Sequence, residues 1–485
     1  MHKSKQYFIM FWILLHVNSV TAQQEFNTLE NRLIADSNSN FKDVNFDIDH
    51  FLKRNNESQL YANSSLSLKQ FVSQDTIADP LSNIMDIGDV AKHMFRKYLK
   101  KKELKNKKNH KEKKDKKLSL LILPDIAYNP VSGVELGLSG SGAGKFKGEE
   151  TNLSMAAAKI AVTSEKQILT FLRASIYTND NEYYINTNWR YYKYNSSTFG
   201  LGTNSPENGF DNHVGFQGAP LDSLSGGYPM DYNFVIIHQV VNKKIRENLY
   251  VGVGYHLDKY WGIKDLSLNL DTSPAQITPH FKYSVKHGFN PTKYTLSGLS
   301  VNTMYDSRDN QISPYKGYFA RLNYQYSPVF LGSSKASSQL WAEFRTYVGL
   351  SKKKPRTVLA FWVFGKFQTS GTMPYLTLMS IANDENSRSG RGYIAGRYRG
   401  ENMVYSEIEY RFPILKKQTL GGVVFLNAVT ASNNDNGENL FDYVRPAAGF
   451  GIRVLVNKHT RLNINLDMGF GFKSKGFYFA AAEAF

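Results

Sequence analysis

The sequence has no cysteine and, after its N-terminus, no long apolar run. Without cysteine the chain has no disulfide, no cysteine-based metal site and no thiol for lipid attachment. A membrane-spanning helix needs about 20 predominantly apolar residues, and no segment of the sequence provides them. A helical protein of the inner membrane is therefore excluded.

Signatures of common catalytic sites are missing as well. No Gly-x-Ser-x-Gly motif indicates a serine hydrolase, and no His-Glu-x-x-His pair indicates a zinc protease. In the glycine-rich stretch before Lys145, Ser139 stands where a phosphate-binding loop needs glycine, and Phe146 follows the lysine. We predict no enzyme, no cofactor and no metal. An active site assembled from residues of separate strands would, however, leave no such motif in the sequence. Loop or lumen positions explain the scattered histidines better than metal ligation: His213, His238, His256, His280 and His287.

The first residues have the parts of a secretory signal peptide. Lys3 and Lys5 give a positive start, and residues 7–17 form an apolar stretch. Small residues then end at Ala22, where a peptidase would cut. We predict that residues 1–22 are a signal peptide cleaved after Ala22, and that the protein is exported to a Gram-negative outer membrane.

Residues 23–116 are rich in Asn, Ser, Asp and Lys and lack sustained alternation, which is typical of low order. We expect a short periplasmic segment with one possible helix at 86–104, where apolar residues recur at helical spacing. Between Lys97 and Lys117, twelve lysines stand against three acids, a net charge of +9. Export argues against nucleic acid as a partner. A solvated linker is the favoured interpretation, and contact with anionic lipid headgroups or an acidic partner is the alternative.

Residues 117–485 change to a period of two, and the chain is rich in aromatics, with 31 Phe and 30 Tyr. In residues 404–412, for example, apolar Val404 and Ile408 alternate with Glu407 and Glu409. Such strands need lipid on one face and water on the other, which a closed barrel supplies. We predict an all-β fold, a 16-stranded antiparallel transmembrane β-barrel. The expected strand starts are near 119, 134, 152, 167, 183, 229, 249, 294, 318, 338, 357, 404, 419, 447, 461 and 477.

The connections between these strands differ in length. Four are long, and long loops of such barrels lie outside the cell while short turns lie in the periplasm. The last predicted strand, from Phe477 to Phe485, ends in an aromatic residue, as is common in outer-membrane barrels. The four long connections are 195–228, 262–293, 371–403 and 431–446.

Two motifs are more specific than the barrel pattern. The first joins the eighth and ninth strands and combines residues suited to a pinned turn: Asp306, Arg308, Asp309, Pro314 and Gly317. The second lies in the long connection before the twelfth strand: Arg391, Gly392 and Tyr393. Glycine allows close backbone approach, and the guanidinium offers five donors to a lumen acceptor. Considered separately, the first motif is also compatible with an ordinary tight turn, and the second with a cationic surface loop.

Together, and in this order, the motifs resemble those of the BamA/TamA superfamily, also called the bacterial surface antigen family. The opening Leu123-Pro124-Asp125-Ile126-Ala127-Tyr128-Asn129-Pro130-Val131-Ser132-Gly133 is similar as well. The resemblance covers about residues 117–485. It implies that the Arg391 loop folds into the lumen and that its arginine docks on the inner wall.

The residue that faces Arg391 differs from the family pattern. The family often has an aspartate in a Phe-x-Asp-x-Gly context, whereas Phe425-Leu426-Asn427-Ala428 stands at the matching place. Asn427 can accept a hydrogen bond but has no charge. Because a buried arginine needs a carboxylate, we predict that Arg391 pairs with Glu407, Glu409 or Asp467, which point inward by alternation.

The resemblance implies a factor that assists insertion or translocation of proteins or lipids at the outer membrane. The mechanism it implies is a weak seam between the first and last strands, near 122–128 and 477–485. Residues 23–116 show no pattern of the POTRA modules that receive client chains, so we expect a barrel without them. Two alternatives stay open: a porin-like channel, and a structural or partner-binding barrel. Expected partners are outer-membrane lipids, client outer-membrane proteins and a second copy of the chain.

Overall fold

The computed structural model describes residues 84–94, 118–129, 133–146, 151–205, 212–216, 227–385 and 387–485. The predicted signal peptide, most of the predicted basic segment and the lysine run up to Lys117 lie outside these residues. Of the two compact units of the chain, the barrel belongs to the one that spans Ile77–Phe485.

The described chain is almost entirely β-structure. Sixteen strands follow one another as an antiparallel meander, each paired with the next. They are β1 (Leu118–Asn129), β2 (Gly133–Gly144), β3 (Ser154–Thr163), β4 (Ile168–Tyr177), β5 (Tyr183–Thr198), β7 (Tyr228–Arg246), β8 (Leu249–Asp265), β9 (Lys293–Asp306), β10 (Gly317–Ser327), β11 (Ser337–Gly349), β12 (Val358–Gly371), β15 (Asn402–Pro413), β16 (Leu420–Ala431), β17 (Arg445–Asn457), β18 (Leu462–Gly471) and β19 (Ser474–Ala481).

The remaining elements belong to the connections and to the segment before the barrel. The strands are β6 (Asn212–Phe216), β13 (Met379–Ser380) and β14 (Arg399–Gly400). The helices are α4 (Ile87–Met94), α6 (Pro279–Lys286) and the short 3-10 turns η2 (Asn179–Asn181), η3 (Val329–Leu331) and η4 (Tyr375–Thr377). Among the described residues, no helix is long and apolar enough to cross a membrane.

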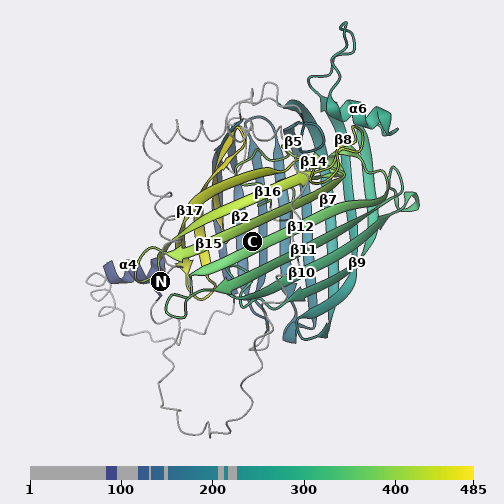
Figure 1. Cartoon of the computed structure of the whole chain (residues 1–485). Coiled ribbons are helices and arrows are strands. Elements are labelled where there is room, and N and C mark those ends of the chain that lie inside the picture. Colours follow the sequence, from purple (N-terminus) through teal and green to yellow (C-terminus); the bar gives the residue numbers. More distant parts are fainter. Residues whose placement is uncertain are drawn as a thin grey trace, which may run out of the picture. The chain divides into compact units, whose positions relative to one another are not determined.

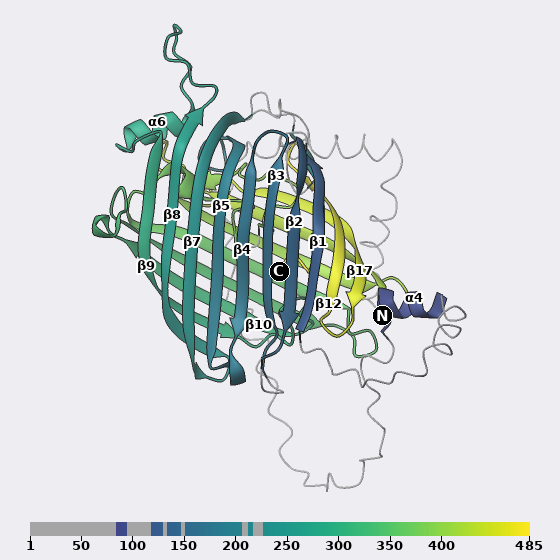
Figure 2. The ribbon, with the colours of Figure 1, turned by 180° about the vertical axis from the view of Figure 1, so that it is seen from behind.

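The meander curls into a barrel (Figures 1 and 2). Between described residues, the strand pairings include no ladder from β1 to β19. The last strand instead pairs with β18 and, in parallel, with the short β6. The first and last strands therefore form a seam without the regular ladder found between their neighbours.

The predicted sixteen-stranded barrel is confirmed. Each predicted strand start lies within three residues of the observed one, because period-two alternation and turn residues both set strand positions. The short strands β6, β13 and β14 inside the connections were not predicted. The end of the chain was predicted wrongly: β19 ends at Ala481, and the strand does not continue to Phe485.

The two ends of the barrel differ. One end, called here the turn side, has connections of at most ten residues. The other, called the loop side, carries four long connections at 199–227, 266–292, 372–401 and 432–444. The wall also varies in height, since β7 has 19 residues and β19 has eight. The last strand, on one side of the seam, is therefore the shortest of the sixteen, whereas β1 on the other side has 12 residues.

The short helix α4 packs against the turn side near the last strands. The backbone N–H of Met85 donates to the carbonyl oxygen of Lys417 at 3.0 Å, and Lys458 Nζ lies 3.0 Å from Asp89 Oδ2. Ile84, just before the helix, is buried. The helix lies within the predicted range 86–104, and the part of that range after Met94 lies outside the described residues.

Candidate functional site

The long connection between β12 and β15 folds back into the barrel and forms the candidate site. Its residues 373–381 and 389–399 are mostly buried. A two-stranded sheet of β13 and β14 closes its base, with Ser380 paired to Arg399. This arrangement puts the Arg391 motif inside the lumen, which is where the resemblance places it.

Arg391 contacts three carboxylates at once. Its Nη1 donates to Asp467 Oδ2 at 2.7 Å and its Nη2 to Glu407 Oε1 at 2.5 Å, while Nη2 also pairs with Glu409. Glu407 and Glu409 lie on β15 and Asp467 on β18. Burial by itself would lower the pKa of Arg391, but the three carboxylates raise it well above the usual range. Arginine stays protonated in proteins, so a charged guanidinium joins the loop to two separated strands.

Two further arginines extend this group into a network. Arg411 Nε donates to Glu409 Oε2 at 2.7 Å, and Arg453 Nη2 to Asp467 Oδ2 at 3.2 Å. Arg453 Nε also donates to Glu483 Oε2 at 2.7 Å. Every member is buried. Because each charge has an opposite partner, the network avoids the several kcal/mol that an unpaired buried ion costs.

Asn427 takes a different role from the one considered from the sequence. Its Nδ2 donates to the backbone carbonyl oxygen of Arg391 at 2.9 Å, so it holds the loop backbone and not the guanidinium. The guanidinium lies over the ring of Phe425, 3.7 Å from its centroid. The strand that carries both residues, β16, thus supports the motif from a third side.

Gly392 and Tyr393 lie close against β18 because the facing residues of that strand are glycines. Gly392 has φ +107°, and a Cβ on Gly469 would lie 2.6 Å from the Gly392 nitrogen. A Cβ on Gly471 would meet the Tyr393 ring at 2.5 Å. The loop also bonds to the last strand, since the Gly392 N–H donates to Tyr478 Oη at 2.8 Å. Close approach at β18 is thus possible only without side chains.

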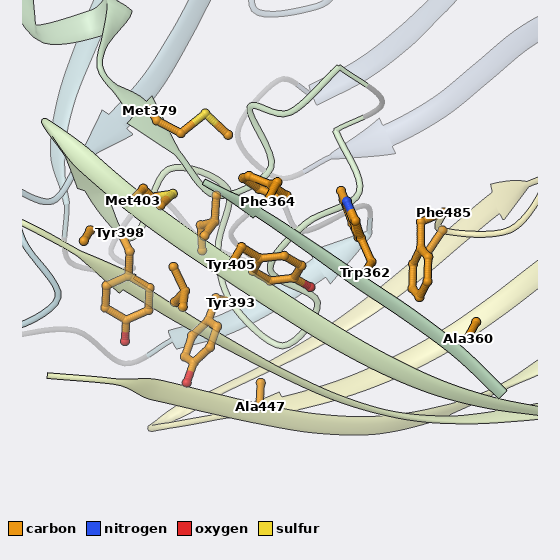
Figure 3. Packing of buried hydrophobic residues seen from close by; sticks show 14 of the residues in the cluster. Ala360, Trp362, Phe364, Met379, Tyr393, Tyr398, Met403, Tyr405, Ala447 and Phe485 are labelled. Atoms are coloured by element: carbon orange, nitrogen blue, oxygen red, sulfur yellow. The ribbon is translucent and has the colours of Figure 1, made fainter. Parts of the chain in front are cut away.

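The last residues of the chain turn into the lumen after β19. Ala482 has φ +68°, and Phe485 is buried with its ring centroid 5.3 Å from that of Trp362 (Figure 3). Arg411 Nη2 donates to the backbone oxygen of Phe485 at 3.1 Å. Together with Glu483, these contacts connect the end of the last strand to the Arg391 network.

In the turn motif, the other predicted site, Asp306 is buried, Arg308 is half-buried and Asp309 is exposed. Arg308 holds Asp306 through two hydrogen bonds of 2.8 Å, and Tyr177 Oη donates to Asp306 Oδ2 at 2.6 Å. Asp309 Oδ1 accepts from the backbone of Tyr315 at 2.9 Å. Pro314 is buried, and Gly317 has φ +107°, with its would-be Cβ 2.8 Å from Arg308 Cα.

This turn and the Arg391 motif lie on different parts of the barrel, yet the turn contacts the last strands. Arg461, in the turn between β17 and β18, donates to Asp309 Oδ2 at 2.8 Å. The Asn310 side chain also donates to the carbonyl oxygen of Thr460 at 3.3 Å. The structure therefore places the two motifs separately but connects both to β17–β19.

Several site residues were not identified from the sequence. They include Arg411, Arg453, Glu483, Gly469, Gly471 and Tyr478. Asp467, Gly469 and Gly471 are spaced two apart and therefore share the inward face of β18. Arg453 faces the lumen from β17 by the same alternation. This inward-facing pattern of charge and glycine could have indicated the two glycines and Arg453. Glu483 and Phe485 gave no such signal, because alternation predicts a continued strand there.

One arrangement resembles a hydrolase triad. His280 Nδ1 lies 2.7 Å from Asp265 Oδ2, and His280 Nε2 lies 3.4 Å from Ser284 Oγ. His280 and Ser284 on α6 are completely buried, and because Asp265 belongs to β8, these contacts hold helix α6 on the barrel. Among the described residues, no cluster of three or more His, Asp or Glu side chains could hold a metal ion.

A polar cavity of about 150 Å³ lies in the lumen beside the site loop. Carboxamides are frequent in its lining, among them Asn186, Asn302 and Gln339, and Lys366 and Arg321 add charge. Loop residues Leu376, Thr377 and Met379 also line it. Such a volume holds on the order of ten water molecules.

A buried loop in the lumen and a meandering barrel with a seam define a class of outer-membrane β-barrel. Residues 169–485, about two thirds of the chain, match the model of the Omp85 superfamily domain. The chain belongs to the Omp85 superfamily, whose barrels are transport and insertion proteins of the bacterial outer membrane. The BamA/TamA resemblance is thereby confirmed.

Three solved structures are among those similar to this chain. BamA from Haemophilus ducreyi lacking POTRA domains 1–3 is 15% identical, with a TM-score of 0.46, and 76% of this chain and 70% of that chain are covered. CdiB from Acinetobacter baumannii is 12% identical, with a TM-score of 0.41 and coverages of 74% and 56%. CdiB from Escherichia coli is 9% identical, with a TM-score of 0.43 and coverages of 74% and 59%. No curated protein matches the sequence. The family assignment rests on the family model.

Proposed function

We propose that this protein assists insertion or translocation of client proteins at the outer membrane in the manner of BamA and TamA, without catalysing a covalent reaction. The observation that carries the proposal is the seam. β1 pairs with β2 and β19 with β18, whereas no ladder joins β1 to β19 in the described part of the chain. An unpaired strand edge presents backbone N–H and C=O groups that a client strand can bind.

The short last strand beside the seam supports the same mechanism. A tilted transmembrane strand needs about 9–11 residues, and β19 has eight and β18 ten, whereas β1 on the other side of the seam has 12. A short hydrophobic wall is accommodated by local thinning of the bilayer. Client strands would then cross a thinner membrane next to an available edge.

The Arg391 loop would keep one side of the seam rigid. Arg391 and its neighbours bond to β15, β16, β18 and β19. We infer that these strands move together, so that opening of the seam displaces β1 and the strands after it. The turn side of the barrel would face the periplasm, because short turns do so in such barrels.

A disulfide lock tests the seam. Because the chain has no cysteine, one cysteine can be introduced in β1 and one in β19 with no native thiol to react in their place. Oxidation is expected to stop assembly of client barrels into vesicles, and reduction is expected to restore it. The matched control, Leu322→Cys with Ala342→Cys, joins register partners on β10 and β11 and should leave assembly unchanged. Full activity of the oxidised seam pair would contradict the proposal.

The polar cavity favours a second candidate, a channel for small solutes. Its lining of carboxamides and charged groups would suit hydrated solutes. The buried loop 372–401 lies in the path, so conduction would require the loop to move. Stable conductance in a planar bilayer that a seam lock does not alter would support the channel and argue against the insertase.

The N-terminal predictions stay part of the proposal. We propose that residues 1–22 are removed on export and that residues 23–116 form a basic periplasmic segment. Mass spectrometry of the mature protein from outer membranes would test both the cleavage after Ala22 and the location. A mature chain that still contained residues 1–22 would contradict the export signal.

A further inference from the structure

We propose that the outer face of β1–β5 carries a binding groove for an anionic phospholipid, with an acyl chain along the small residues of β2 and β3 and its headgroup at Lys145. The inference needs only that the barrel lies in a bilayer. It does not depend on the insertase mechanism.

The groove follows from the strand register. Gly140 on β2 pairs with Ile122 on one side and Ala158 on the other, and Ala158 pairs with Leu172. The next row toward the turn side again has two small residues, Gly142 and Ala156, and Gly144 then pairs with Ser154. Three successive rows therefore have almost no side chain, over about 14 Å of strand.

Large side chains flank this floor on both sides. Ile122 is 64% exposed, and Leu172 and Trp189 lie beyond Ala158 in the same row. Two adjoining hollows result, of about 580 and 670 Å³, and both are lined by Ile122, Gly140, Ala158 and Leu172. These volumes are in the range of about 300–1,000 Å³ that is typical of ligand sites.

The side chains around the groove point outward, toward the membrane, which favours a lipid chain as the occupant. Ala156, Ala158, Ile160 and Val162 are the exposed residues of β3, and the first three alternate with half-buried neighbours. In a membrane-spanning barrel, the exposed apolar face meets lipid chains. The groove is thus continuous with the lipid-facing surface, and an acyl chain fills it without displacing water.

The charge at the turn-side end favours an anionic headgroup. Lys145 and Phe146 follow Gly144 directly, are both exposed and both line the hollow. Lys243 is exposed at the same edge on β7, and the acidic Glu182 and Glu247 there reduce but do not cancel the basic charge. A lysine at the membrane surface contributes about 1 kcal/mol to the binding of anionic lipid. An aromatic ring beside it is typical of the membrane interface.

The test is lipid retention by the full chain. The protein is purified from nanodiscs that contain equal amounts of phosphatidylglycerol and phosphatidylethanolamine, and the lipid retained in detergent is measured by native mass spectrometry. The wild type should retain phosphatidylglycerol preferentially. Ala156→Leu with Ala158→Leu fills the floor and should lower retention about tenfold, since several buried methylenes lose their place. Lys145→Gln should lower the preference for phosphatidylglycerol about fivefold.

A matched variant separates filling of the groove from added bulk. Ala342→Leu adds the same side chain on the outer face of β11, away from the groove, and should retain lipid like the wild type. Gel mobility of heated and unheated samples shows that each variant is folded. Equal retention by the filled variant and the wild type would overturn the proposal. So would a change in oligomer size without loss of lipid, which would identify the groove as a contact between two copies.

Discussion

The hydroxyl oxygen of Tyr478 accepts a hydrogen bond from the backbone N–H of Gly392 at 2.8 Å and lies 3.2 Å from the carbonyl oxygen of Tyr393. This is a direct contact between the last strand of the barrel and the loop that carries Arg391. A strand at a seam has few backbone partners, so side-chain contacts of this kind determine how firmly it is held. The last strand and the lumen loop are expected to move as one unit.

Removal of this hydroxyl should loosen the last strand. Tyr478→Phe loses both contacts, and a hydrogen bond contributes about 1 kcal/mol. Hydrogen exchange of β19 amides should become about fivefold faster, with no change in β10 or β11. Unchanged exchange in β19 would show that the loop does not hold the strand.

Replacement of Arg391 should strongly destabilise the barrel. Arg391→Ala leaves Glu407, Glu409 and Asp467 without their shared cation, and an uncompensated buried charge costs about 3–5 kcal/mol. Arg391→Lys keeps the charge but not the planar fork, so its loss should be smaller. The midpoint of urea unfolding in lipid vesicles measures both. The control is Arg246→Ala at an exposed position, and an equal effect there would contradict the assignment.

Gly471 on β18 should not tolerate a side chain. Gly471→Val places its Cβ about where the Tyr393 ring lies, and overpacking costs about 1–3 kcal/mol. Displacement of the loop should expose residues near Arg391 to protease in detergent. Ala448→Val adds bulk on the exposed outer face of β17 and should be cleaved no faster than wild type.

The stability of the turn should depend more on the Asp306–Arg308 ion pair than on the hydrogen bond from Tyr177. Asp306→Asn leaves the half-buried Arg308 without its carboxylate, at a cost of about 3 kcal/mol, whereas Tyr177→Phe removes one hydrogen bond, at a cost of about 1 kcal/mol. The two variants should lower the urea midpoint in this order. The reverse order would show that the hydrogen bond of Tyr177, and not the ion pair, stabilises the turn.

Some contacts of the site could be predicted from the sequence and others could not. Arg391 was expected to meet a carboxylate, because a buried guanidinium requires one, and Glu407 and Glu409 are close in sequence on a strand whose alternation is clear. That Asp467 would join them could only be offered as an option. It lies 76 residues away, and the curvature of the barrel brings β15 and β18 to the same guanidinium.

The sequence by itself determined the number and order of the barrel strands and where each begins to within three residues, because side chains in a strand alternate between two faces and turn residues interrupt that alternation. Turn residues indicated a pinned turn, and the lumen position of the Arg391 loop was implied by the family resemblance. Only the tertiary structure decided how Arg411, Arg453 and Glu483 share charges, and why Phe485 leaves the strand direction after Ala481. Those contacts join strands that are remote along the chain, and local periodicity contains no information about which remote strands will face each other across a lumen.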